Sequence, residues 1–425
     1  MTDIAKSTLP DNVVKEIPTQ SDQAERGVEF IDDVRDRNVY ILGAGFSAPA
    51  GVPVIHDFID RSRIYFDDPS SRLDKTEREH FKRFLDFKRR MSQAREKVKI
   101  DLDNIEELFG LVEISQRLGH ESIETRTSTV YVIAKTLELA TRSQRVGEID
   151  FQANKEILKK RGKPPEGFYR PEGYSDEVLA ADPYLYFASL ASGLLDDPNR
   201  QTSRANTFIT FNYDLLLDDA LRKVGIAPDY RLPKQNTVVE DQESQPTTDC
   251  SVLKLHGSTN WGICASCHAR VVVLTEKVTA SAAQFRARAC PNCGQSEFQP
   301  MLIPPSWDKS EYRELMKPIW SKAVEELKLA SRICIIGYSM PEADSFFKYL
   351  IALALAENHN LYRFIVVDKN PNIAARYKNL LEPLFRERRF FPFDDPVGFS
   401  AFLSHGRSCA ELGRGELVWG NLSRR

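Results

Sequence analysis

Short apolar runs rich in β-branched residues alternate along this chain with longer segments of helical periodicity. Five of these runs end in polar or glycine residues: "NVYILGAGFS", "ANTFITFNYD", "CSVLKLHGS", "RICIIGYS" and "YRFIVVDKNP". Continuous apolar runs of this length predict strands that are buried on both faces. Five such strands separated by helical patterns predict an α/β fold with an open, mostly parallel, doubly wound sheet.

A segment of different character, residues 60–200, separates the first two predicted strands. Its stretches "KTEREHFKRFLDFKRRMSQAREKV" and "NIEELFGLVEISQRL" carry apolar residues at a spacing of three to four, which is typical of amphipathic helices. We interpret this segment as a helical insertion. The predicted organisation is a flexible arm at 1–30, a main domain at 31–400 that contains the insertion, and a tail at 401–425.

Composition excludes some classes of protein but does not identify a ligand. The 425 residues are 42% hydrophobic, with a formal net charge of -3 and a pI near 6.2. This balance supplies no general attraction for nucleic acid, so direct nucleic-acid binding is not expected. No run approaches the roughly 18 apolar residues of a membrane span, and the first residues lack a signal-peptide pattern. We therefore expect a cytoplasmic protein that does not enter a membrane.

The ends of the five predicted strands place their polar residues at one edge of the sheet. Ligands of open parallel sheets bind beyond the carboxyl ends of the strands, at the point where the strand order reverses. These residues therefore converge on one predicted crevice. They are Gly43 to Ser47, Asn212 to Asp214, His256 to Ser258, Gly337 to Ser339, and Asp368 to Asn370.

The first strand leads into the glycine-rich turn "GAGFSAPAGVP". Glycines permit positive φ and close backbone approach, and a helix N-terminus favours a diphosphate, so the turn predicts a nucleotide site. A tight turn without a ligand is the alternative. Ser47 and Ala48 stand where a third glycine of G-x-G-x-x-G would be, and no acidic residue follows at the spacing of a dehydrogenase. This argues against ordinary hydride transfer.

Four cysteines form two C-x-x-C pairs between residues 262 and 300. Their spacing suits a tetrahedral thiolate site for Zn²⁺ in a small zinc-ribbon module, and four thiolates leave no open position for water. The ion would therefore be structural. Free cysteines are the alternative, and we expect His268 to be a neighbour and not a ligand. The predicted ligands are Cys264, Cys267, Cys290 and Cys293.

Taken in order, "GAGFSAPAGVP", "TFNYD", "LHGS", "GYSMPEAD" and "VVDKNP" resemble the motifs of the sirtuin family. The resemblance covers about half of the chain, residues 38–58 and 205–395. It is strongest to divergent prokaryotic members of anti-phage defence systems, which degrade NAD⁺. It implies a Rossmann-like fold, NAD⁺ as substrate and a structural zinc ion.

The resemblance also implies roles for individual residues. Asn212 would contact the nicotinamide ribose and place the attacking water, and Asp214 would bind the nicotinamide carboxamide. His256 would be a general base, although a lone histidine at a strand end is also explained by burial against backbone. The remaining contacts to NAD⁺ would come from Gly43, Ala44, Gly45 and Ser47 on one side, and from Gly337, Ser339, Asp368 and Asn370 on the other.

The sequence departs from the protein deacylases of the family at two places. Val54-Ile55-His56 stands where the deacylases carry Asp-Phe-Arg, and "MLIPPSWDKS" replaces the strand that clamps acyl-lysine peptides. Pro304 and Pro305 cannot donate ladder hydrogen bonds. Hydrolysis of NAD⁺ is therefore the leading hypothesis. A deacylase, an ADP-ribosyltransferase and a non-catalytic NAD⁺ or ADP-ribose sensor remain as alternatives.

The resemblance further implies that such a chain works in an assembly. We expect a homo-oligomer, a separately encoded partner such as a hexameric translocase ATPase, or both. The helical insertion is a candidate for assembly or gating.

Overall fold

The computed structural model describes ten segments of the chain. The predicted arm at 1–30 and tail at 401–425 lie outside them. The described residues are 37–145, 183–191, 205–239, 250–274, 289–295, 298–304, 312–341, 344–361, 363–382 and 390–393.

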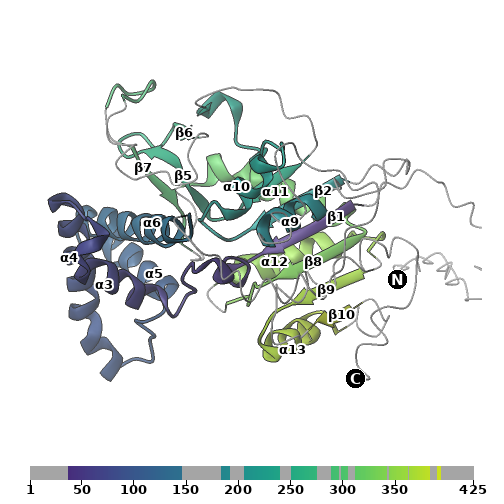
Figure 1. Cartoon of the computed structure of the whole chain (residues 1–425), viewed down its shortest axis with the longest axis horizontal. Helices are drawn as coiled ribbons and strands as arrows, with labels where there is room; N and C mark the ends of the chain where they lie inside the picture. Colours follow the sequence, from purple (N-terminus) through teal and green to yellow (C-terminus); the bar gives the residue numbers. More distant parts are fainter. Residues whose placement is uncertain are drawn as a thin grey trace, which may run out of the picture. The chain divides into compact units, whose positions relative to one another are not determined.

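The main domain is built on a six-stranded sheet in which every pair of neighbours is parallel, in the order β10-β9-β8-β1-β2-β4 (Figure 1). The prediction of a doubly wound parallel sheet is confirmed. The chain moves from β1 outward to β2 and β4 on one side, and then fills the other side with β8, β9 and β10. The order therefore reverses beside β1. The strands are β1 (Arg37–Leu42), β2 (Ala205–Thr210), β4 (Ser251–Lys254), β8 (Arg332–Ile336), β9 (Arg363–Val367) and β10 (Phe390–Phe393).

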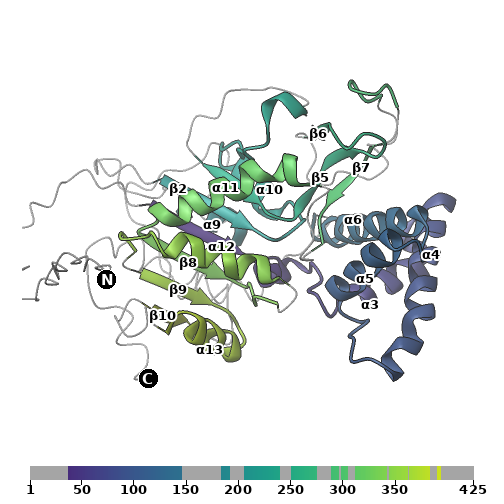
Figure 2. The ribbon, with the colours of Figure 1, turned by 180° about the vertical axis from the view of Figure 1, so that it is seen from behind.

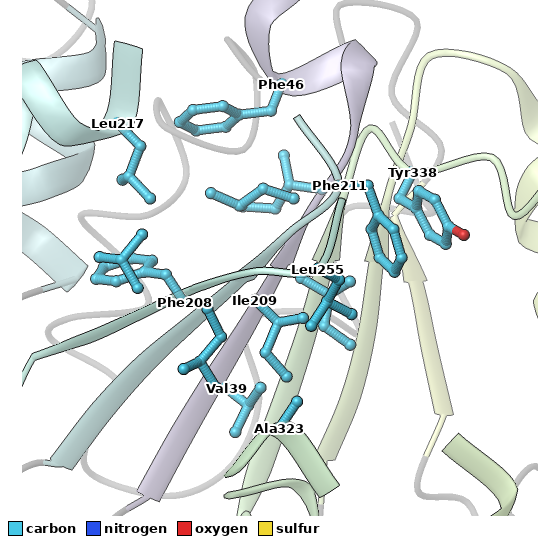
Figure 3. Close-up of a cluster of buried hydrophobic side chains, with 14 of the residues drawn as sticks. Val39, Phe46, Phe208, Ile209, Phe211, Leu217, Leu255, Ala323 and Tyr338 are labelled. Atoms are coloured by element: carbon cyan, nitrogen blue, oxygen red, sulfur yellow. The ribbon is translucent and has the colours of Figure 1, made fainter. Parts of the chain in front are cut away.

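Helices cover both faces of this sheet. Figure 1 shows α9 in front of the strands, and the reverse view in Figure 2 shows α11 and α12 in front of them. Ile41, Phe208 and Ile335 between these layers have no exposed surface, and Figure 3 shows part of the resulting core. The helices are α9 (Pro183–Ala191), α10 (Leu216–Lys223), α11 (Arg313–Leu329), α12 (Ser345–Leu355) and α13 (Pro371–Leu380).

In the described residues up to 145, the predicted helical insertion has four helices that share a second hydrophobic core. Phe81, Phe84 and Phe87 recur at helical spacing and are fully buried in it. The first turn of the helix that carries them is closed by a capping box between Asp74 and Glu77. The helices are α3 (Phe58–Asp67), α4 (Lys75–Met91), α5 (Ile105–Arg117) and α6 (Ile123–Arg145).

One helix from the predicted insertion segment packs against the main sheet. Tyr184 of α9 belongs to the same core cluster as β1 and β2. Its hydroxyl donates to the carbonyl oxygen of Phe46 at 2.9 Å and accepts from the N–H of Ala50 at 3.1 Å. Helix α9 therefore supports the backbone just after the glycine-rich turn.

A second sheet of four strands consists of β3, which precedes β4 in the chain, and three strands that follow β4. Its order is β3-β6-β5-β7, and β5 runs antiparallel to both β6 and β7. The turn into β5 needs glycine, because Gly257 has φ of +84° and a Cβ atom there would lie 2.0 Å from the Met301 carbonyl oxygen. The strands are β3 (Thr237–Val239), β5 (Gly257–Cys264), β6 (Val271–Val273) and β7 (Phe298–Leu302).

Among the helices in the described segments, none combines the length and the apolar character needed to cross a membrane.

Candidate functional site

The turns that follow β1 and β8 lie against each other at the end of the parallel sheet. The N–H of Gly45 donates to the carbonyl oxygen of Gly337 at 2.8 Å. A Cβ atom at Gly43 would lie 2.5 Å from Cα of Tyr338, and one at Gly45 would lie 2.7 Å from Cα of Gly337. Gly337 has φ of +62°, which favours glycine. The three glycines are therefore required where the two turns meet, at the switch point of the sheet.

The first turn leads directly into α2 (Ala44–Ser47), which is four residues long. A short 3-10 turn, Ala48–Ala50, follows it. Ser47 is fully buried and Ala44 is partly buried. The predicted succession of strand, tight turn and helix is confirmed, and this helix is only four residues long.

Asn212 follows β2 and reaches back to the first glycine turn. Its Nδ2 donates to the carbonyl oxygen of Gly43 at 2.9 Å and to Oγ of Ser47 at 3.0 Å. The N–H of Asn212 donates to Oγ1 of Thr210 at 3.1 Å, which fixes the backbone at the strand end. Three residues that the sequence assigned to one site are therefore in direct contact.

Asp214 lies deeper in the same loop and is 7% exposed. Its carboxylate accepts the N–H of Leu216 at 3.1 Å. Burial raises the pKa of Asp214, although the positive charge of Lys254 and a hydrogen bond from Ser47 act in the opposite direction. The carboxyl group therefore holds a proton more readily than an exposed aspartate does.

A buried ion pair that was not predicted from the sequence supports this loop. Nζ of Lys254 donates to the backbone oxygen of Asp214 at 2.6 Å and contacts the Asp218 carboxylate at 3.0 Å. The hydroxyl of Tyr230 donates to the same carboxylate. Burial alone would raise the pKa of Asp218, but the charges of Lys254 and Arg222 outweigh it and lower the pKa. These contacts therefore hold the loop that carries Asn212 against the end of β4.

His256 follows β4 and is 4% exposed. Its Nε2 lies 3.6 Å from Oδ2 of Asp344, a residue that the sequence analysis did not select. The ring of Phe211 meets the imidazole edge-on, with 5.1 Å between centroids. Phe211 in turn stacks on Tyr338, with 4.0 Å between centroids (Figure 3). His256 is therefore packed among aromatic rings beside one carboxylate.

The residues predicted after β8 and β9 lie at the neighbouring strand ends. Ser339 and Met340 offer their carbonyl oxygens to the guanidinium of Arg376, at 2.8 Å and 2.9 Å. Oδ1 of Asp368 accepts the N–H of Asn370 at 2.8 Å, and the Asn370 side chain caps α13. Burial raises the pKa of Asp368. These groups border the second glycine turn, because the N–H of Gly337 donates to the Val367 carbonyl at the end of β9.

The helical insertion borders the site on one side. The N–H of Ile105, at the start of α5, donates to the carbonyl oxygen of Ile55, just after the glycine-rich turn, at 3.3 Å. Arg126 of α6 pairs with Glu113 at 2.7 Å and donates to the hydroxyl of Tyr312, which precedes α11, at 2.6 Å. All three of these side chains are buried. The insertion is therefore hydrogen-bonded both to the loop after the glycine-rich turn and to the residue before α11.

The four cysteines form one cluster in which all sulfur atoms lie within 4.8 Å of one another. Cys264 lies 3.7 Å from Cys293, and Cys267 lies 3.7 Å from Cys290, sulfur to sulfur. Sulfurs at the corners of a zinc tetrahedron with bonds of about 2.3 Å would lie about 3.8 Å apart. The donor set and its spacing therefore fit a zinc ion. Nε2 of His268 instead lies 2.8 Å from the Ala265 carbonyl oxygen.

Comparison with known proteins finds a family match in the second half of the chain. Residues 206–387 match the family model described as a SIR2-like domain, within the range of the predicted resemblance. Among the curated proteins, no sequence matches this chain. The solved structure of Sir2Tm bound to a propionylated peptide is 14% identical, with a TM-score of 0.34, over 88% of this chain and 92% of that chain. A Sir2 homolog in complex with NAD is 13% identical, with a TM-score of 0.36, over 88% and 90%.

Proposed function

Residues 206–387 match a SIR2-like domain, and on this basis we propose that the chain is a sirtuin-like protein that binds NAD⁺ and hydrolyses it to nicotinamide and ADP-ribose. The observation that carries the proposal is the meeting of the two glycine turns with Asn212 at the switch point of the sheet. The switch point of an open parallel sheet is the place where such folds bind dinucleotides. Asp214 lies on the loop after β2, and His256 follows β4, which is the neighbour of β2 in the sheet.

These residue types suit cleavage of the bond between nicotinamide and ribose. The transition state develops positive charge at the ribose carbon, so orientation of the leaving group and placement of water matter most. An amide such as that of Asn212 can orient a ribose hydroxyl and a water without being consumed. Asp214 can bind the nicotinamide carboxamide in either protonation state, as donor or acceptor. His256 would accept a proton as the bond to oxygen forms.

Water is favoured over an acyl-lysine as the acceptor because of the segment after β7. The N–H of Ile303 donates to the carbonyl oxygen of His256 at 2.8 Å, and the Tyr213 hydroxyl donates to the carbonyl of Ile303. Both backbone groups of Ile303 are thus engaged, and Pro304 has no N–H to offer to a peptide strand. This segment does not provide the ladder that a clamped peptide would need.

We further propose that Zn²⁺ binds the four cysteines and has a structural role. Four thiolates complete a tetrahedral shell, and the ion would join the end of β5 and the turn after it to the segment that precedes β7. The zinc would therefore hold the small sheet together without entering the reaction.

The resemblance to defence proteins extends the proposal to the biological role. Depletion of NAD⁺ would make the chain a toxic effector during phage infection, acting as a homo-oligomer or with a partner such as a hexameric ATPase. The bonds from Ile105 and Arg126 to the sheet domain support a role for the helical insertion in transmitting such a partner's effect.

The experiment is a product assay with purified protein, alone and with proteins encoded beside it. The proposal requires equal amounts of nicotinamide and ADP-ribose. Formation of acyl-ADP-ribose with an acetyl-lysine peptide would instead indicate deacylation. A binding-only sensor is favoured by one observation, the burial of His256 to 4% exposure. Tight binding of NAD⁺ with no nicotinamide released under any condition would establish that alternative.

A further inference from the structure

The carboxylate of Asp344 faces His256, the proposed general base. Nε2 of His256 and Oδ2 of Asp344 are 3.6 Å apart, and their side chains are 4% and 1% exposed. The hydroxyl of Tyr338 donates to the same Oδ2 atom at 2.6 Å. A carboxylate is costly to bury unless hydrogen bonds or an opposite charge compensate. Here a phenol and an imidazole are arranged to do so.

The surroundings of the pair strengthen its electrostatic coupling. Phe211 stacks on Tyr338 and meets His256 edge-on, so aromatic rings replace water on that side. A low local dielectric makes the interaction between buried charges stronger than it is at a surface. Two titratable groups beside His256 are Asp344 before α12 and Tyr213 after β2.

The two tyrosines around the pair stay protonated. Burial and then the carboxylate of Asp344 raise the pKa of Tyr338 well above its ordinary value. Burial raises the pKa of Tyr213 in the same way, with further contributions from Glu106 and Asp344. The tyrosines therefore act as hydrogen-bond donors near the site and do not exchange protons near neutral pH.

We propose that Asp344 is a positioning residue that holds the imidazole of His256 through Nε2–H and stabilises its protonated form. This inference rests on the proposed function. The observed separation of 3.6 Å exceeds a hydrogen bond of about 2.7–3.2 Å, so the proposal requires the pair to close by about half an ångström when substrate binds. In this tautomer Nδ1 is the nitrogen that takes up a proton.

The step balances as a hydrolysis. The bond between the ribose carbon and the nicotinamide nitrogen breaks with its electron pair going to nicotinamide. Water forms the new carbon–oxygen bond and gives one proton to Nδ1 of His256, which later releases it to solvent. The carboxylate of Asp344 remains ionised throughout and offsets the positive charge of the imidazolium.

The first test replaces the carboxylate by a neutral amide of the same shape. In Asp344→Asn we expect kcat for NAD⁺ cleavage to fall at least about 10-fold with little change in KM, because the variant does not alter substrate contacts. The acidic limb of the pH profile should move to lower pH, since a negative charge beside the imidazolium has been removed. Unchanged kcat and an unmoved limb would overturn the proposal.

The second measurement does not depend on catalysis. NMR titration of histidine-labelled protein, with the His256 signal assigned from His256→Gln, should show a midpoint about one pH unit or more lower in Asp344→Asn. Equal midpoints would refute the pairing. If the midpoint moves but no variant nor the wild type releases nicotinamide, the pairing holds and the proposed function fails.

Two further variants serve as a control for Asp344→Asn and as a substitute for it. Asp67→Asn removes an exposed carboxylate from the end of α3 and should leave both readouts unchanged. If Asp344→Asn does not fold, Tyr338→Phe carries the test, because it removes only the hydrogen bond that orients the carboxylate. We expect its kcat to fall about 3-fold or more at constant KM. Wild-type kcat in this variant would then count against the proposal.

Discussion

The side-chain amide of Asn212 donates to the carbonyl oxygen of Gly43 at 2.9 Å, so the loop after β2 holds the glycine turn after β1. The same nitrogen lies 3.0 Å from Oγ of Ser47. One side chain thus ties together the two loops that border the switch point. This contact gives Asn212 a role in shaping the site in addition to any contact with a ligand.

The packing of the two glycine turns predicts a severe effect of Gly337→Ala. Its Cβ atom would lie 2.3 Å from the Gly45 carbonyl carbon, and its φ of +62° is unfavourable for alanine. We expect the free energy of unfolding to fall by about 2 kcal/mol or more. Gly110→Ala is the matched control, since a Cβ there meets nothing within 4 Å in helix α5, and it should stabilise by about 0.5–1 kcal/mol. Urea unfolding measures the free energy of unfolding of both variants. Similar changes for Gly337→Ala and Gly110→Ala would contradict the close packing of Gly337 against Gly45.

The buried ion pair predicts a large loss of stability for Lys254→Met. The variant leaves the Asp218 carboxylate buried without its cation, and breaking such a pair costs about 3–5 kcal/mol. Lys223 forms an ion pair of similar length with Asp219 but its side chain is 41% exposed. Lys223→Met should therefore change the free energy of unfolding by less than about 1 kcal/mol. Equal losses for the two lysines would show that burial does not govern the Lys254 pair.

The raised pKa of Asp214 predicts a pH-dependent gain in stability for Asp214→Asn. Because burial raises this pKa above the ordinary 3.8, the folded state binds a proton more tightly than the unfolded state. The resulting cost to folding is absent at low pH and develops as pH rises through the raised pKa. The amide keeps an acceptor for the Leu216 N–H without the charge. The stability difference in favour of the variant should grow as pH rises above about 4 in urea unfolding, and a constant or shrinking difference would argue against this sign.

The cysteine cluster predicts one zinc ion per chain in metal analysis of purified protein. Cys290→Ser should lose the ion and lower the thermal midpoint, because binding to the folded state contributes directly to its stability. Cys334 lies in β8, outside the cluster. Cys334→Ser should therefore keep its zinc. A zinc-free wild type, prepared without chelator, would refute a structural metal site.

The main sheet could be predicted from sequence because its strands are continuous β-branched runs. Strand β10 was missed because its sequence, FFPF, is short, contains a proline and follows a charged stretch. The glycines were recognised as turn residues, but sequence alone does not show that Gly45 packs against Gly337, which lies in a distant part of the chain.

The site was predicted in part. The residues that were not predicted share one reason: their partners are distant in the sequence. Asn212, Asp214 and His256 follow strands and were found from their positions. Lys254 is a single cation in an apolar run, and its partner Asp218 is set by the fold. Asp344 ends the motif "GYSMPEAD", eight positions after β8, and the motif by itself does not show which side chain Asp344 contacts.

The most direct test of the central claim is release of nicotinamide from NAD⁺ by wild type and by Asn212→Ala, assayed with and without the proteins encoded beside this chain. Asn379→Ala, on the exposed side of α13, is the matched control. The account predicts nicotinamide and ADP-ribose in equal amounts from wild type and the control, and at least about 100-fold slower release from folded Asn212→Ala. Release at the wild-type rate from Asn212→Ala, or none from the wild type in any combination, would contradict it.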